Sequence, residues 1–176
     1  MNGLDTPEWV SQIQIRNAEE RDLPALEWEG EFIHYRRLYS QIFQTTREGR
    51  ALIWIAEWGE VGLIGQVFVQ LASERFDLAD GNKLAYIYGF RVKSAYRNVG
   101  VGSKILGFIE DDLFRRLYER ATLNVAQTNR LALQFYLRHG YKIIGTEPGQ
   151  WAYIDHLGVR REVNEPAWRM EKLLLG

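Results

Sequence analysis

The chain has 176 residues and a mass of 20.6 kDa, which predicts one domain, residues 1–176, built on a single hydrophobic core. Hydrophobic residues make up 46% of the chain and charged residues 26%, a composition that excludes a disordered or low-complexity protein. Its 22 basic and 23 acidic residues leave a net charge of -1, which excludes a general basic surface for nucleic acid or an anionic membrane and favours a small ligand.

Cysteine is absent, which excludes disulfides, thiolate nucleophiles and zinc sites that need sulfur, and fits the reducing cytoplasm, where we expect the protein. Residues 1–10 contain Asp5 and Glu8 and no apolar run, so we expect no signal peptide. The longest uncharged apolar stretch, Val61–Ser73, is shorter than the ~20 residues of a spanning helix, so we expect no membrane contact. The histidines lack ligand spacing, and no metal is expected.

The first half of the chain alternates between strand and helix patterns. Residues 1–11 are expected to form a loose tail, and the glycines of Trp58–Gly62 allow the turn of a hairpin. Apolar residues recur at a period of two in strands and at spacings of three and four in helices. The predicted elements are a strand at Ile13–Arg16, a helix from Asn17 or Asp22 to Trp28, a helix at Glu31–Gln44, and strands at Ala51–Ala56 and Leu63–Gln70.

The second half continues the alternation after a turn-rich segment, Glu74–Asn82. Gly89, inside an apolar strand pattern, indicates a bulge or a close approach of a ligand. The predicted elements are a strand at Leu84–Val92, a helix at Gly102–Arg120, a strand at Ala121–Val125, a helix at Arg130–His139, a strand from Tyr141, a polar and aromatic segment at Trp151–Pro166, and a strand at Trp168–Leu174. The order β-α-α-β-β-β-α-β-α-β-β predicts an α/β or α+β domain.

The segment Val92–Gly102 joins a strand to a helix through a loop with two close glycines. The N–H groups at a helix N-terminus lack intrahelical partners and, with the helix dipole, favour an anion such as a pyrophosphate. No Gly-Lys-Ser/Thr occurs in the chain, and Gly100-Val101-Gly102 lacks the third glycine of a dinucleotide fingerprint. The loop is therefore neither a P-loop nor a Rossmann motif.

Two ordered motifs resemble the GNAT superfamily of N-acetyltransferases. Val92-x-x-x-x-Arg97-x-x-Gly100-x-Gly102 is similar to its motif A, and Asn129-x-x-Ala132-x-x-Phe135-Tyr136-x-x-x-Gly140-Tyr141 is similar to its motif B. The resemblance covers about residues 13–174. It implies a mixed, mostly antiparallel central sheet of about six or seven strands, flanked by about four helices.

The resemblance also implies a site for acetyl-CoA between the strand that ends at Val92 and the strand that ends near Val125. Phe90 and Val92 would offer main-chain groups to the pantetheine and thioester, and Asn129 would reach the pantetheine arm. The expected pyrophosphate loop comprises Arg97, Asn98, Val99, Gly100, Val101 and Gly102. The alternative interpretations are turn residues for Gly100 and Gly102, a solvated charge for Arg97, and a helix cap for Asn129.

Tyr136 is the expected general acid. A phenol with a reference pKa near 10 stays protonated at neutral pH and can give a proton to the departing CoA thiolate. A buried helix aromatic is the alternative interpretation. An amine with a pKa near 10.4 is only about one part in a thousand neutral near pH 7.4, so a base or a water chain must accept its proton.

The sequence assigns no base, because Leu84–Val92 contains no carboxylate. Glu57, Asp155, His156 or water between them are the candidates. Glu27, Glu29 and Glu31, around Trp28 and Gly30, form an acidic and aromatic patch suited to a cationic amine, with a solvated helix face as the alternative. The tentative substrate residues are therefore Glu29, Glu31, Glu57 and Asp155.

We expect an N-acetyltransferase that moves the acetyl group of acetyl-CoA to the primary amine of a small molecule or peptide by direct attack, without a metal or a nucleic-acid partner. One alternative is a CoA-binding regulatory module without transfer activity. Another is an interaction domain without CoA affinity. A homodimer is compatible with the resemblance, but no interface pattern supports it.

Overall fold

The computed structural model describes residues 5–175 and contains a seven-stranded sheet in the order β1-β2-β3-β4-β5-β9-β6. β4 and β5 pair in parallel, and the other neighbours in this sheet pair antiparallel. The mixed, mostly antiparallel fold predicted from the sequence is thus confirmed. The strands and α-helices are β1 Gln14–Asn17, α1 Arg36–Arg47, β2 Ala51–Trp58, β3 Gly62–Gln70, β4 Leu84–Val92, α2 Val101–Arg115, β5 Arg120–Ala126, α3 Arg130–Arg138, β6 Lys142–Glu147, β7 Gln150–Ile154, β8 Arg160–Asn164 and β9 Ala167–Leu173.

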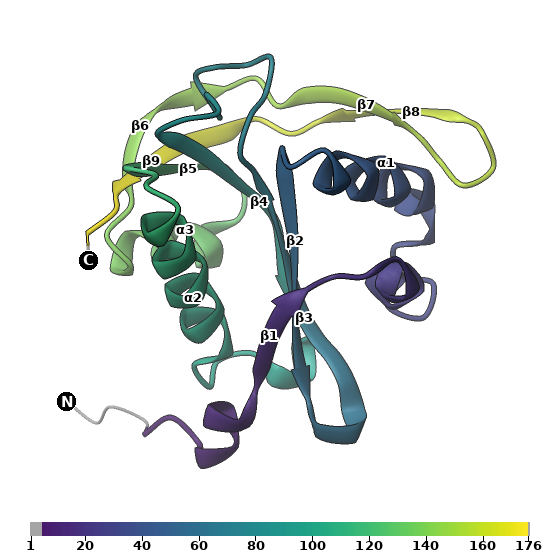
Figure 1. Cartoon of the computed structure of the whole chain (residues 1–176). Helices are drawn as coiled ribbons and strands as arrows, with labels where there is room; N and C mark the ends of the chain where they lie inside the picture. The colour runs from purple at the N-terminus through teal and green to yellow at the C-terminus, as the bar shows by residue number, and fades with distance from the viewer. Residues whose placement is uncertain (1–4, 176) are drawn as a thin grey trace.

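The sheet separates two hydrophobic cores. α2 and α3 cover one face, and α1 with the 3-10 segment η2 (Glu20–Glu27) covers the other (Figure 1). Ile105, Ile109 and Leu113 of α2 are buried against the first face, while Tyr39 and Phe43 of α1 are buried against the second. Each helix buries the apolar stripe that its spacing of three and four residues creates.

Three helix predictions differ from the structure. The first predicted helix is the 3-10 segment η2, because Pro24 lies inside it and has no N–H for an i→i−4 bond. The second begins at Arg36, after a 3-10 turn, rather than at Glu31. α2 ends at Arg115, where Leu117 takes a positive φ of 70° and turns the chain toward β5.

Two segments are more ordered than the sequence predicted. Within the expected tail, Glu8–Gln12 form a 3-10 turn whose Val10 is buried, and the amine of Lys104 donates to the carbonyls of Val10 and Ile13. The segment 151–166 contributes to a separate two-stranded sheet, β7–β8, which reaches over α1 (Figure 1). In the described part of the chain, no helix is long and apolar enough to cross a membrane.

β4 carries a bulge near its C-terminal end. The register against β3 shifts between Gln66, opposite Arg91, and Phe68, opposite Tyr88, so β4 holds one extra residue there. Gly89 lies in this bulge with a φ of +58°. The sequence prediction of a bulge at Gly89 is confirmed, and the bulge turns the last residues of β4 relative to its buried first half.

Gly89→Ala is expected to lower the free energy of unfolding by about 3 kcal/mol, since strained φ and overpacking each cost this order. A Cβ at Gly89 would lie 2.4 Å from a ring carbon of Phe68, on a φ of +58°. Gly107→Ala is the matched control, because a Cβ there meets nothing within 4 Å and Ala favours a helix interior. Urea unfolding measures both variants. Equal stability of Gly89→Ala and the unmodified protein would contradict the packing described here.

Candidate active site

β4 and β5 separate where their parallel pairing ends, at Ile87 and Leu123. The Lys93 N–H donates to the Ile64 carbonyl of β3. Because successive residues of a strand point their backbone groups to opposite sides, the N–H and C=O of Val92 point away from β3, toward the opening beside β5. The Val92 carbonyl accepts a hydrogen bond from Nε of Arg97 at 2.6 Å, which leaves the Val92 N–H for a ligand.

The loop before α2 presents backbone N–H groups. Asn98 and Gly100 have positive φ values of 64° and 97°, and Gly100 is the N-cap of α2. Among residues 5–175 no side chain caps this helix, and the first intrahelical N–H to find a partner is that of Lys104, which donates to the Gly100 carbonyl. The N–H groups of residues 101–103 therefore remain for an anion.

Two asparagines flank the opening. Oδ1 of Asn129 accepts from the Ala132 N–H at 3.1 Å and caps α3, so its amide nitrogen is left as a donor. Nδ2 of Asn124, on β5, donates to the Tyr86 hydroxyl at 3.4 Å, whereas its buried Oδ1 has no partner among residues 5–175. The uncapped N-terminus of α2 fits a pyrophosphate, and the orphaned amide oxygen of Asn124 fits an N–H group of a ligand.

Tyr136 lies on α3 and is 9% exposed. Its ring packs edge-on against Phe135 at 5.2 Å and against Tyr141 at 5.6 Å between ring centroids. Burial first, and then the neighbouring Tyr86, raise the pKa of Tyr136, so the hydroxyl is protonated at neutral pH. Phe135 also contacts Phe90 of β4, at 6.1 Å, which ties α3 to the bulge.

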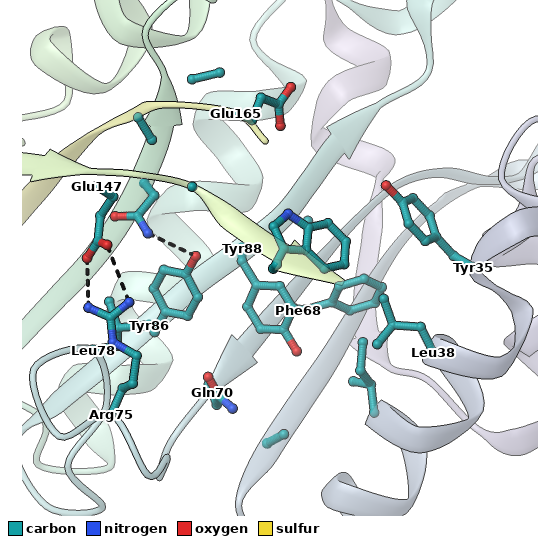
Figure 2. Close-up of a pocket in the computed structure, with 18 of the residues that line it drawn as sticks. Tyr35, Leu38, Phe68, Gln70, Arg75, Leu78, Tyr86, Tyr88, Glu147 and Glu165 are labelled. Atoms are coloured by element: carbon teal, nitrogen blue, oxygen red, sulfur yellow. Dashed lines mark hydrogen bonds and ion pairs between the residues drawn. The ribbon is translucent and has the colours of Figure 1, made fainter. Parts of the chain in front are cut away.

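A cavity of about 940 Å³ lies on the other face of β4. Figure 2 shows Tyr86, Tyr88 and Phe68 of the sheet, Tyr35 and Leu38 beside them, Glu147 at the end of β6, and Glu165 from the connection between β8 and β9. Trp151 of β7 also lines it and stacks on Tyr35 at 6.3 Å between ring centroids, so part of the polar and aromatic segment Trp151–Pro166 lines the cavity. The cavity reaches Gly89 and Asn124, at the opening between β4 and β5.

The two carboxylates on the cavity wall differ in their ion pairs. Glu147 accepts from Arg75 at 2.8 Å and from Arg169 at 3.3 Å, and both arginines also hold Asp77, whose pKa they lower to about 2. Glu165 has no ion-pair partner among the described residues. Within residues 5–175, no group of three or more His, Cys, Asp or Glu side chains could hold a metal ion.

The tentative substrate residues lie outside this cavity. Glu29 forms an ion pair with Lys93 at 3.3 Å and, with Glu31, lines a separate hollow beside the loop Lys93–Arg97. Glu57 is paired with Arg16. The buried Asp155 accepts from backbone N–H groups of the β7–β8 turn and from Nε of Arg161 at 2.9 Å.

Sequence reasoning missed Arg91, Tyr39 and Asn124. Each lines the cavity, but none belongs to a contiguous motif. Asn124 carried the clearest signal, since it is an amide within the otherwise apolar run Ala121–Val125. Arg91 carried a weaker one, as a charge among the aromatic residues of β4.

The comparison with known families agrees with this geometry. Residues 13–141 match the acetyltransferase (GNAT) family. The chain belongs to the GNAT family. It is therefore an acyltransferase, and nothing in the comparisons favours a module without transfer activity. GNAT enzymes use acetyl-CoA, and the residues expected from the sequence to bind it stay a prediction.

Individual relatives agree with the family. N-alpha-acetyltransferase 50 of Danio rerio is 26% identical over 128 residues, which are 68% of this chain and 74% of the relative. Ard1 from Thermoplasma volcanium has a TM-score of 0.70 at 17% identity, with 94% of this chain and 99% of that chain covered. An Elizabethkingia anophelis GNAT acetyltransferase with acetyl-CoA bound has a TM-score of 0.62 at 13% identity, covering 93% and 99%. At these identities the two structures show a shared fold.

Proposed function

We propose that this GNAT enzyme transfers the acetyl group of acetyl-CoA to an amine held in the cavity, by direct attack of the amine. The observation that carries the proposal is the opening between β4 and β5, which joins the uncapped N-terminus of α2 on one face to the cavity on the other. When bound, acetyl-CoA supplies an acetyl thioester to this opening. Relatives named as an N-alpha-acetyltransferase and as spermidine N-acetyltransferases support an amine acceptor.

The cofactor residues act mainly through the backbone. In the proposal the N–H groups of residues 101–103, with the loop Arg97–Gly100, bind the pyrophosphate, and the main chain of Phe90 and Val92 orients the thioester. Nδ2 of Asn129 binds the pantetheine arm. Oδ1 of Asn124 accepts from a ligand N–H at the opening, which satisfies an otherwise orphaned oxygen.

Two proton transfers accompany the reaction. Tyr136, protonated at neutral pH because burial raises its pKa, gives its proton to the departing sulfur. The amine proton leaves through water in the cavity, and Glu165, which has no ion-pair partner among residues 5–175, is the wall carboxylate that can receive it. Glu147 is unsuited to this role because Arg75 and Arg169 hold it.

The test is calorimetric titration with acetyl-CoA followed by a thiol-release assay against a panel of primary amines. Because the chain has no cysteine, every thiol detected comes from CoA. We expect micromolar binding and thiol release that depends on the amine, with a reaction lacking amine as the control for hydrolysis. Binding without amine-dependent release from any member of a broad panel would contradict the proposal.

A further inference from the structure

The cavity holds a half-buried arginine that lacks a carboxylate partner. The guanidinium of Arg91, on β4, lies 4.4 Å from the centre of the Phe32 ring and 5.7 Å from that of Tyr35. Nη1 of Arg91 donates to the Tyr39 hydroxyl at 3.4 Å. Among the described residues no carboxylate forms an ion pair with it. Of the two carboxylates on the cavity wall, Glu147 is held by other arginines and Glu165 forms no ion pair.

The lack of a carboxylate partner distinguishes Arg91 from Arg75, the other arginine that lines the cavity. Arg75 and Arg169 both form ion pairs with Asp77 and Glu147. These two positive charges are therefore neutralised within the protein. The titratable side chains near Arg91 include Tyr35 and Tyr39, whose pKa values burial raises, and His34, whose pKa is lowered by burial first and then by Arg91 and His156. A partly desolvated guanidinium without a counter-ion is costly, and its planar fork fits a carboxylate.

The position of Arg91 places a bound anion close to the reaction. Arg91 lies between Phe90 and Val92, the residues whose main chain is proposed to orient the thioester. Its side chain is on the α1 side of the sheet, next to Tyr39, while the Phe90 ring is on the α3 side, against Phe135. An acceptor whose amine lies one or two carbons from its anionic group can therefore bind Arg91 through that group while its amine reaches the thioester.

The rest of the wall fits an apolar or aromatic body. Within the cavity of about 940 Å³, the ring of Tyr39 packs on Phe68 at 5.3 Å and Phe68 on Tyr88 at 5.4 Å. Trp151 of β7 lines the same cavity, and Figure 2 labels the rings of Tyr35, Phe68 and Tyr88 on its wall. Such a surface binds a flat hydrophobic group by burial and edge contacts.

We propose that the acceptor is a small amine with a carboxylate on the adjacent carbon and an aromatic or apolar body, as in an α-amino acid, and that Arg91 binds the carboxylate. The inference rests on the proposed acetyltransferase function and names its substrate class. Arg91 is then a specificity-determining residue, because it distinguishes acceptors by their anionic group.

Matched acceptors test the substrate class. Phenylalanine carries the carboxylate, phenylalaninamide and the peptide Phe-Gly-Gly mask it, and the phosphonate analogue of phenylalanine replaces it. We expect a kcat/KM about 100-fold higher for phenylalanine than for the amide or the peptide, the order that a hydrogen-bonded charge pair supplies. Equal values, or a preference for the peptide or for the phosphonate, would overturn the inference.

Variants test the residue. Arg91→Gln should lower kcat/KM for phenylalanine about 100-fold and leave that for phenylalaninamide within about twofold, while Arg91→Lys, which keeps the charge but not the fork, should lose about tenfold. Arg115→Gln, an exposed arginine in the last turn of α2, is the control. Equal losses for both acceptors would overturn the role of Arg91.

Acetyl-CoA titration of the same proteins distinguishes a failure of the substrate inference from a failure of the proposed acetyltransferase function. A wild-type protein that binds acetyl-CoA and acetylates other amines, but none of these acceptors, overturns only the substrate class. A folded wild-type protein that does not bind acetyl-CoA overturns the proposed function, and the substrate inference with it.

Discussion

Gly100→Glu is expected to weaken the binding of acetyl-CoA by at least about 100-fold. Gly100 is the N-cap of α2, has a φ of +97° and leaves the first N–H groups of the helix without a side-chain cap. A glutamate there places a negative charge beside the site of two further negative charges and a side chain where the pyrophosphate must approach the backbone. Calorimetric titration of the variant with acetyl-CoA measures the loss.

The substitution also introduces backbone strain, so a matched control is needed. Gly49 has a φ of +77°, lies just beyond α1 and has nothing within 4 Å of its missing Cβ. Gly49→Glu therefore adds the same charge at a similarly positive φ, far from the loop Arg97–Gly102 and without the 3.2 Å contact that a Cβ at Gly100 would make with Thr6. If Gly100→Glu binds acetyl-CoA as tightly as Gly49→Glu does, the pyrophosphate is bound elsewhere.

The proposed cofactor half of the site could be derived from the sequence because its residues are contiguous. Arg97–Gly102 form one strand-to-helix loop, and the backbone N–H groups of a helix start depend on local geometry that glycines and spacing encode. Asn129 is likewise set by its place at the start of α3, where it caps the helix. For such residues the sequence pattern and the three-dimensional site nearly coincide.

The acceptor half could not be predicted in this way, because its residues come from distant segments. Arg91 faces Tyr39 across 52 positions of the sequence, and Trp151 reaches Tyr35 only because β7 extends over α1. The sequence instead favoured Glu29 and Glu31, whose acidic cluster is local but lies on a separate hollow. Local charge density does not indicate a cavity formed by tertiary contacts.

The differences between the predicted and the observed helices have a similar cause. Spacing predicted helices before Trp28 and from Glu31, but spacing does not distinguish a 3-10 from an α-helix. Pro24 and the left-handed conformation of Trp28 decide the matter locally, and Trp28 is held there by the hydrogen bond from its indole Nε1 to Gln66 at 2.9 Å. The partner on β3 is tertiary information that the pattern before Trp28 does not contain.

Tyr136→Phe is expected to lower kcat by about 100-fold or more at every pH from 6 to 10, while the affinity for acetyl-CoA stays the same. Proton transfer by a placed side chain contributes this order of rate. Because burial raises the pKa of Tyr136 above its ordinary value of 10.0, the hydroxyl is still protonated over this range, and its loss should change the level of the pH profile rather than its shape. Steady-state kinetics across that range provide the measurement.

The control must separate catalysis from packing, since Tyr136 is nearly buried between Phe135 and Tyr141. Phe keeps the ring that makes those contacts, so the unfolding free energy of Tyr136→Phe should change little. Tyr118→Phe removes a hydroxyl that donates to the Leu71 carbonyl at 3.2 Å, away from the opening, and should cost about 1 kcal/mol of stability with kcat unchanged. Full turnover by a folded Tyr136→Phe would show that the departing sulfur takes its proton from water, and the role of α3 would then be limited to orienting the cofactor.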